Sequence, residues 1–378
     1  MNPFHFEKKY FKNADWLLNL SIFIFLIASS LMIFSTSRNI VENQPYYYVI
    51  RHLIAMGLGM GLFLISSYLD YHFWKNLQIP IYLVMILMLI AVLFIGMEGD
   101  YGGQSWIPMG PISLQPVELA KIILILNLAG FIQNEKRCNS VLCLFWLLLI
   151  MGIPLGLVML QPDLGSGLVF LAIWFGIVFI SGVHMKYLFG LMAGGLAVFP
   201  FLWSKLEEYQ KIRILIFTNL DYYKTNSAFA KYTWQLIQSI IAIGSGRLWG
   251  RGYLQGTQTQ LEFVPEKHSD MIFSALAEEF GFIGSGALIL LYLFLIYRIF
   301  RVGQQSNDGF ARLICTGMGS MLLFHLLVNV GMTLGVMPVT GIPWPLMSYA
   351  SSNLMAVLWG LGIVNSIALR SNKMFFGN

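Results

Sequence analysis

The stretch WLLNLSIFIFLIASSLMIFST, from Trp16 to Thr36, runs for 21 residues without a charged side chain. A helix needs about 20 consecutive apolar residues to cross the hydrocarbon core of a bilayer. Because lipid offers the backbone no hydrogen-bond partner, such a segment is expected to be helical. Lys8, Lys9 and Lys12 precede it, but no small-residue cleavage site follows. We therefore interpret it as a retained transmembrane helix and not as a signal peptide.

The whole chain has the same character. Only 11% of its 378 residues are charged, while 57% are hydrophobic. Soluble domains carry about 25% charged residues, so this chain lacks the charge needed to coat a water-facing surface. The composition excludes a soluble globule and a disordered chain. It also excludes a nucleic-acid binder, because the net charge of +5 has no broad polar surface on which to form a basic groove.

The same length criterion, applied along the chain, predicts an all-α polytopic membrane protein. It forms a single membrane domain over residues 1–378 with ten transmembrane helices. The predicted segments are 16–36, 52–70, 78–97, 116–133, 141–160, 165–183, 187–204, 269–298, 309–334 and 344–369.

The short loops carry their positive charge unequally. With the N-terminus inside, twelve Lys and Arg residues lie in short inner segments and two, Arg38 and Arg51, in short outer loops. This bias places both termini in the cytoplasm. The long loop 205–268 is expected outside, since the rule applies poorly beyond about 60 residues. Within it, WQLIQSIIAIGSG (Trp234–Gly246) is too short to span and predicts an interfacial or re-entrant piece.

Some polar residues lie inside predicted spans, where a charge costs at least ~2.5–3.5 kcal/mol. Glu118 and Lys121 are three residues apart and share one helix face. They form either a structural ion pair or part of a functional cavity. His325 and Asn329, four residues apart, predict a hydrogen-bonding pair between helices.

Asp270 stands where the long loop enters the eighth predicted helix. It is a simple helix cap or, as the first member of a polar stripe with Ser274 and Glu278, the opening of a water-accessible cavity. A carboxylate in such a cavity, with cations nearby, suits a general base acting on a phosphate-bearing lipid. A proton-coupled transporter remains an alternative.

Five motifs, in order, resemble those of the SEDS family (shape, elongation, division and sporulation; RodA, FtsW and SpoVE). Their details resemble the RodA branch more than the FtsW branch. They are GGQSWIPMGPISLQPVELAKI (Gly102–Ile122), LQPDLGSG (Leu160–Gly167), YQKIRILIF (Tyr209–Phe217), QSIIAIGSGRLWGRGYLQGTQTQLEFVPEKHSDMIFSALAEEFGFIG (Gln238–Gly284) and NVGMTLGVMPVTGIPWPLMSY (Asn329–Tyr349).

The resemblance implies a peptidoglycan glycosyltransferase of the bacterial cytoplasmic membrane that polymerises lipid II during cell elongation. It implies a class B penicillin-binding transpeptidase and other elongation-complex membrane proteins as partners. It also implies Mg²⁺ or Mn²⁺ as a divalent cofactor. The alternatives are a flippase for a lipid-linked precursor, a division or sporulation paralogue, and a scaffold that recruits the transpeptidase.

The resemblance also implies roles for individual residues. Asp270 would be the catalytic base. The substrate-binding residues would be Glu118, Lys121, Asp163, Arg213, Lys267, His268 and Ser348. Arg213 would bind a headgroup phosphate, because a planar guanidinium suits bidentate contact. The chain departs from the family at Ser105, where an arginine is usual, which removes one phosphate contact.

Overall fold

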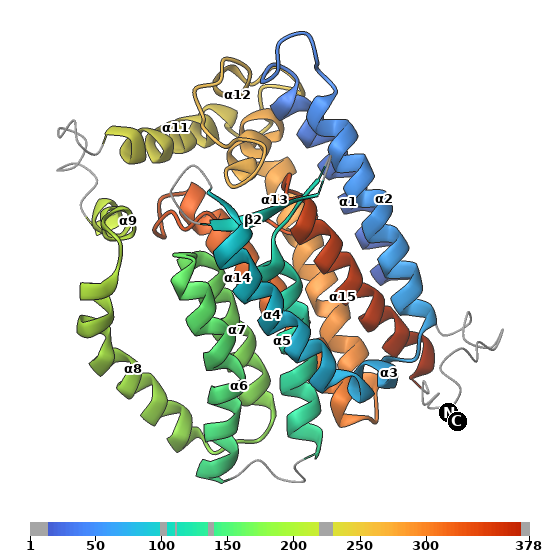
Figure 1. Cartoon of the computed structure of the whole chain (residues 1–378). Helices are drawn as coiled ribbons and strands as arrows, with labels where there is room; N and C mark the ends of the chain where they lie inside the picture. The colour runs from blue at the N-terminus through green and yellow to red at the C-terminus, as the bar shows by residue number, and fades with distance from the viewer. Residues whose placement is uncertain (1–13, 99–103, 110–111, 135–139, 219–229, 372–378) are drawn as a thin grey trace.

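The computed structural model describes residues 14–98, 104–109, 112–134, 140–218 and 230–371, and shows a bundle of helices capped at one end (Figure 1). The bundle comprises α1 (Trp16–Ser37), α2 (Tyr47–Tyr68), α4 (Gln78–Ile95), α5 (Pro116–Asn134), α6 (Val141–Leu160), α7 (Leu164–Ile180), α13 (Ile272–Gln305), α14 (Gly309–Thr333) and α15 (Ser351–Arg370). The helix α8 (Met185–Lys205) stands apart from the bundle for most of its length, at the left of Figure 1. We call the end where α1 begins and α15 ends the terminal end, and the opposite one the loop end.

Short elements connect these helices. At the terminal end lies α3 (Tyr71–Asn76), and at the loop end lie α9 (Glu208–Thr218), α11 (Ala230–Gly246) and α12 (Thr257–Gln260). A small antiparallel sheet of β1 (Met97–Glu98), β2 (Gln104–Met109) and β3 (Ile112–Leu114) connects α4 to α5. The sheet is the one departure from the all-α prediction among the described residues. In its register Met97 pairs with Trp106, and Ile107 pairs with Leu114.

Eight helices in the described part of the chain are long and apolar enough to cross a membrane: α1, α2, α4, α5, α6, α13, α14 and α15. At 17 residues, α7 is a shorter apolar helix. The remaining predicted span, 187–204, coincides with α8, which is not among the eight. The prediction of a polytopic helical membrane protein is thus confirmed, while the count of ten stays a prediction.

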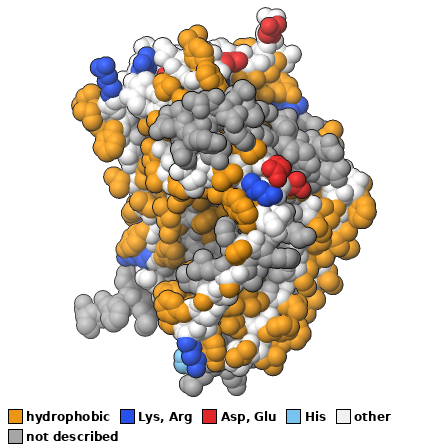
Figure 2. Space-filling view, turned by 90° about the vertical axis from the view of Figure 1, so that its left-hand side faces the viewer, with side chains coloured by type: hydrophobic (Ala, Val, Ile, Leu, Met, Phe, Trp, Pro, Cys, Tyr) orange, Lys and Arg blue, Asp and Glu red, His pale blue; other side chains and the backbone are white. Residues whose placement is uncertain are grey.

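The surface of the bundle is apolar where a soluble protein would be polar. Hydrophobic side chains cover much of the middle of the face that Figure 2 shows. Phe94 is 81% exposed and Phe282 is 73% exposed, although both are large and apolar. A surface with this many large exposed apolar side chains is typical of a protein covered by lipid, because their exposure to water would cost roughly 25 cal/mol per Å² of apolar area.

The predicted span 269–298 is wrong in one respect, because the chain breaks sharply at Gly281. There φ is 67° and ψ is −168°, a backbone conformation that is almost confined to glycine. A short buried arm precedes the break, and the long lipid-facing part of α13 follows it. The loop after α11 supplies the hydrogen bonds that the broken helix lacks. These bonds run from Arg251 N to Glu278 O (2.9 Å), Gly252 N to Glu279 O (3.0 Å), Phe282 N to Arg247 O (2.9 Å) and Ile283 N to Leu248 O (3.1 Å).

The carboxylate of Glu278 fastens the next part of the loop to the same arm. It accepts hydrogen bonds from the backbone N–H of Gln258 and of Thr259, both at 2.8 Å, and from the Thr259 hydroxyl at 2.6 Å. Ser274 is also buried, and its hydroxyl lies 2.6 Å from that of Ser239. The predicted polar stripe therefore does not open a water-accessible cavity. Its inner members hold the loop in place, because the loop covers the face on which they lie.

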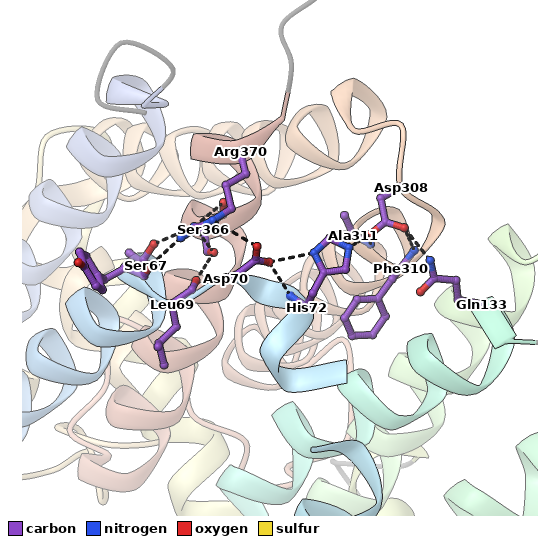
Figure 3. A network of polar contacts seen from close by, with 11 residues as sticks. Ser67, Leu69, Asp70, His72, Gln133, Asp308, Phe310, Ala311, Ser366 and Arg370 are labelled. Atoms are coloured by element: carbon purple, nitrogen blue, oxygen red, sulfur yellow. Dashed lines mark hydrogen bonds and ion pairs between the residues drawn. The ribbon is translucent and has the colours of Figure 1, made fainter. Parts of the chain in front are cut away.

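A cluster of charged side chains, the terminal clasp, closes the other end of the bundle (Figure 3). His72 of α3 lies 2.9 Å through Nδ1 from Asp70 Oδ1 and 3.4 Å through Nε2 from Asp308 Oδ2. Asp308 accepts a hydrogen bond from Gln133 of α5 (2.7 Å), and Asp70 lies 3.9 Å from the Arg370 guanidinium of α15. The clasp therefore ties together the ends of four helices that are distant in sequence.

We predict that Gly281→Ala destabilises the protein by about 3 kcal/mol or more, because the added methyl meets backbone in a strained conformation. An ideal Cβ there would lie 2.2 Å from Gly250 N and 2.6 Å from Leu248 O. Gly286 on the same helix has open space around its Cβ position, so Gly286→Ala is the matched control. Thermal unfolding in detergent measures both variants. Equal melting temperatures would contradict the role assigned to the break.

A second prediction concerns the pH dependence of the terminal clasp. Hydrogen bonds to Asp308 and then to Asp70 raise the pKa of His72 to about 9. Its contribution to stability is complete below the unfolded pKa of about 6.5 and is lost as pH rises through 9. Because His72 is half exposed, we expect a modest fall of about 1–3 °C in melting temperature between pH 7 and 10. His72→Gln should remove this fall in melting temperature, and His184→Gln, at an exposed position, should keep it. A fall that persists in His72→Gln would refute the role assigned to protonated His72.

Candidate functional site

Asp270 lies in the turn before α13, at the loop end of the bundle. Its position depends on Asn329 of α14, whose side-chain amide donates to Asp270 O and to Ile342 O, both at 2.8 Å. His325, one turn away, lies 3.0 Å through Nδ1 from Pro343 O. The prediction that His325 and Asn329 join two helices is therefore corrected. They hold the loop between α14 and α15 and the turn that carries Asp270.

Arg213 and Gly341 converge on the Asp270 side chain. A Cβ added to Gly341 would lie 3.3 Å from Asp270 Oδ2 and 3.8 Å from Arg213 Nη1. Gly341 has φ of 72°, so both its conformation and its crowded position favour glycine. In the sequence Gly341 is visible only as a turn residue. In the structure Gly341 lies against both the Asp270 carboxylate and the Arg213 guanidinium, whose residues are 57 positions apart in the sequence.

The surroundings of Asp270 raise its pKa to about 7. Removal from water is the largest cause, and the negative charge of Glu266 adds to it, while Arg213 opposes the rise. The charge of Asp163 is the smallest of these effects and also raises the pKa. A carboxylate with this pKa is divided between its two protonation states near neutral pH, which suits a group that accepts and releases a proton.

Asp163 takes part in the architecture of the site through a helix cap. Its Oδ1 accepts from Ser166 N (3.0 Å) at the start of α7, and its Oδ2 accepts from the Gln115 amide (3.5 Å). The adjacent Gly165 packs closely on Thr340 O of the loop that contains Gly341. Asp163 thus lies beside the site and acts on Asp270 through its charge.

Glu118 and Lys121 form a buried ion pair near the loop end of α5. The Lys121 ammonium lies 2.7 Å from Glu118 Oε1, and the two side chains are 2% and 4% exposed. Asn353 of α15 donates to Glu118 Oε2 at 2.7 Å. A buried pair needs such extra hydrogen bonds to offset its desolvation. The geometry favours the structural alternative, and contact of this pair with substrate stays a prediction.

The other predicted substrate-binding residues hold loops. Lys267 is buried and donates to Thr259 O (2.6 Å), and burial lowers its pKa. The Ser348 hydroxyl accepts from Trp344 N at 2.9 Å within a turn. The His268 ring packs between Tyr48 and Tyr349, with ring centroids 4.8 Å and 5.5 Å away. Of the three, only His268 contacts a residue of a membrane-spanning helix, Tyr48 of α2. Substrate contact by any of the three stays a prediction.

Metal ligands are scarce around Asp270. Nowhere in the described residues do three or more His, Cys, Asp or Glu side chains come together as a metal site would require. Glu266 accepts from the Ser269 hydroxyl (2.7 Å), and Asp163 is occupied as a cap. A divalent ion held by protein ligands alone does not fit these residues.

The arrangement supports one kind of chemistry. A base poised near neutral pH lies beside a guanidinium at the loop end of a membrane bundle. Asp270 can accept a proton from a hydroxyl group of a bound molecule. Arg213 can pair with an anionic group bound at the same site, such as a phosphate.

Comparison with known proteins agrees with this picture. The model of the FtsW/RodA/SpoVE family, described as cell cycle protein, matches residues 15–373. Peptidoglycan glycosyltransferase MrdB of Escherichia coli K12 is 34% identical over 357 residues, which cover 94% of this chain and 93% of MrdB. Peptidoglycan glycosyltransferase RodA of Treponema pallidum is 29% identical, covering 94% of this chain and 98% of its own.

Two solved structures share the fold. One, from work on structural coordination of polymerization and crosslinking by a peptidoglycan synthase complex, has a TM-score of 0.79 at 31% identity, with 94% of this chain and 97% of that chain covered. The crystal structure of the rod shape determining protein RodA of Thermus thermophilus has a TM-score of 0.70 at 29% identity, with 95% and 97% covered. With a family match over nearly its full length, this chain belongs to the FtsW/RodA/SpoVE family.

Proposed function

We propose that this protein is a peptidoglycan glycosyltransferase that polymerises lipid II into glycan strands during cell elongation. The observation that carries the proposal is the Asp270 carboxylate, with a pKa raised to about 7, beside the Arg213 guanidinium. The names of the relatives MrdB and RodA supply the reaction, and the geometry supplies the residues that would perform it.

In this mechanism Asp270 removes the proton from the 4-hydroxyl of the acceptor sugar. The hydroxyl oxygen then attacks the anomeric carbon of the donor sugar. The bond from that carbon to the pyrophosphate oxygen breaks, and undecaprenyl pyrophosphate leaves with the bonding electron pair. A single in-line displacement inverts the anomeric carbon. Arg213 pairs with the pyrophosphate and stabilises the negative charge that develops on it.

Mg²⁺ or Mn²⁺ remains part of the proposal on the strength of the family resemblance alone. When bound, a divalent cation would neutralise charge on a pyrophosphate leaving group. Since no group of three His, Cys, Asp or Glu among the described residues is arranged so that it could hold a metal ion, we propose that the cation arrives with the pyrophosphate. The residues of this chain bind and orient the lipid and hold the proton.

The proposed setting is the bacterial cytoplasmic membrane, crossed by ten helices of one domain, with both termini in the cytoplasm and the loop 205–268 outside. Eight apolar helices and the positive charge of the short loops support it. The similarity to a chain of a peptidoglycan synthase complex supports a class B penicillin-binding transpeptidase as the partner. Other elongation-complex membrane proteins would join this pair.

The position of the polar groups favours polymerisation over lipid flipping. A flippase needs a polar path from one membrane surface to the other. Asp270 and Arg213 lie at the loop end, and the inner polar residues Ser274 and Glu278 are buried and hydrogen-bonded within the protein. These contacts support a site open at one end.

We predict that Asp270→Asn abolishes glycan formation by purified protein with lipid II, a divalent cation and a cognate transpeptidase, because an amide cannot accept the proton. We expect a loss of about 10²-fold or more, in line with removal of a general base. The near-isosteric change should leave the melting temperature close to that of the wild type. Equal glycan chain formation by the mutant would reject Asp270 as the base, and a scaffold would be favoured if the mutant also restored cell shape.

The pH dependence tests the electrostatics of the same group. Because the base acts in its ionised form, the polymerisation rate should rise between pH 6 and 8 with an apparent pKa near 7. Glu266→Gln removes a charge that raises the Asp270 pKa, so its rate profile should move to lower pH. Glu262→Gln, at an exposed position in the same loop, is the control and should leave the profile in place. An unmoved profile in Glu266→Gln would contradict the assignment.

A further inference from the structure

A second cation, Arg51, lies near the site from a different direction. It comes from the loop end of α2, whereas Arg213 comes from α9. Its guanidinium carbon lies 4.3 Å from the centroid of the Tyr47 ring. Burial raises the pKa of the Tyr349 hydroxyl, and the positive charge of Arg51 opposes that rise. Among the described residues no carboxylate forms an ion pair with Arg51. Its charge is therefore available to an anionic ligand.

An aromatic cluster connects Arg51 to the catalytic turn. The rings of Tyr48 and Tyr349 lie 5.0 Å apart and nearly perpendicular, and both pack on His268. Tyr349 N also donates to His268 O at 2.8 Å. Since His268 is two positions before Asp270 in the sequence, these contacts hold the start of α2 against the turn that carries the base. Arg51 lies near the start of α2, shortly after Tyr48, so the same contacts place its backbone beside that turn.

An open surface cavity of about 410 Å³, lined among the described residues only by those between 43 and 54, lies beside Arg51 along α2. Tyr46, Tyr47, Ile50 and Ile54 contribute to its walls. Ile50 is 55% exposed and Ile54 is 39% exposed, and both lie on a helix apolar enough to span the membrane. The cavity thus has an apolar side that faces lipid, with Arg51 between Ile50 and Ile54, and its polar residues Asn43 and Gln44 lie towards the loop end. This pattern matches a lipid with a phosphate at its head and a hydrocarbon chain below it.

Polymerisation joins two substrates that each carry a lipid-linked pyrophosphate. Arg213 is one phosphate-binding group next to Asp270, and a second is needed on another side of the base. We propose that Arg51 binds the pyrophosphate of the second polyprenyl-linked saccharide, with its lipid chain lying along Ile50 and Ile54. A guanidinium suits this task because its planar donors contact two phosphate oxygens at once. This inference rests on the proposed function.

Binding can be measured separately from catalysis. Protein carrying Asp270→Asn in detergent micelles is incubated with undecaprenyl pyrophosphate, and native mass spectrometry counts the bound copies. We expect two copies on this background and one after Arg51→Gln, with the second site weakened by roughly tenfold or more. Arg51→Lys should retain weak binding, because it keeps the charge without the planar donors. Arg247→Gln, at an exposed arginine of the large loop, is the matched control and should bind two copies.

Two further ligands identify the source of the phosphate. Undecaprenol has the same chain without charge, and its binding should not change in Arg51→Gln, which also shows that the variant is folded. Phosphatidylglycerol represents ordinary anionic lipid, and its binding should also stay the same. The proposal is overturned if Arg51→Gln still binds two copies of undecaprenyl pyrophosphate with unchanged affinity. It is equally overturned if phosphatidylglycerol binding falls in parallel, since the cavity would then belong to ordinary phospholipid. Absence of glycan synthesis by the wild type would instead refute the proposed function and leave the binding result standing.

Discussion

The structure of the loop end depends on the backbone hydrogen bonds between the α13 break at Gly281 and the loop that follows α11. A helix that breaks near a membrane must find new partners for its free N–H and C=O groups, because lipid supplies none. Here the segment around Gly250 supplies them, and only glycines allow the two backbones to approach so closely. The same contact holds the large loop against the bundle. Consequently the short arm that follows Asp270 has a fixed position, and so does its carboxylate.

Polar contacts gather at both ends of the bundle and serve different purposes. At the terminal end the clasp around His72 joins four helix ends and has no ligand chemistry assigned to it. At the loop end, buried side chains such as Glu278 and Asn329 hold loops, and their hydrogen bonds are with protein groups. The proposed site would place a base beside two large lipid headgroups. It would gain from this rigidity, because a misplaced base loses much of its rate advantage.

The electrostatics of the site come from opposing effects on one carboxylate. Burial and the charge of Glu266 favour the neutral form of Asp270, and Arg213 favours the ionised form. With the first effects larger, the pKa settles near neutral pH. Each neighbour therefore has two roles. Arg213 restrains the pKa and is the proposed contact to phosphate. Glu266 raises the pKa and accepts a hydrogen bond from the Ser269 hydroxyl of the same turn.

The sequence by itself determined the membrane class and the approximate helix positions, because the length and hydropathy of a segment act locally. The motifs identified the family and singled out Asp270 and Arg213. Only the tertiary structure decided which polar residues hold loops, since Glu278 and Ser274 look in sequence like the lining of a cavity. The break at Gly281 and the closeness of Gly341 to Asp270 also required it. These features depend on contacts between segments far apart in the chain, and spacing along one helix carries no information about what covers its face.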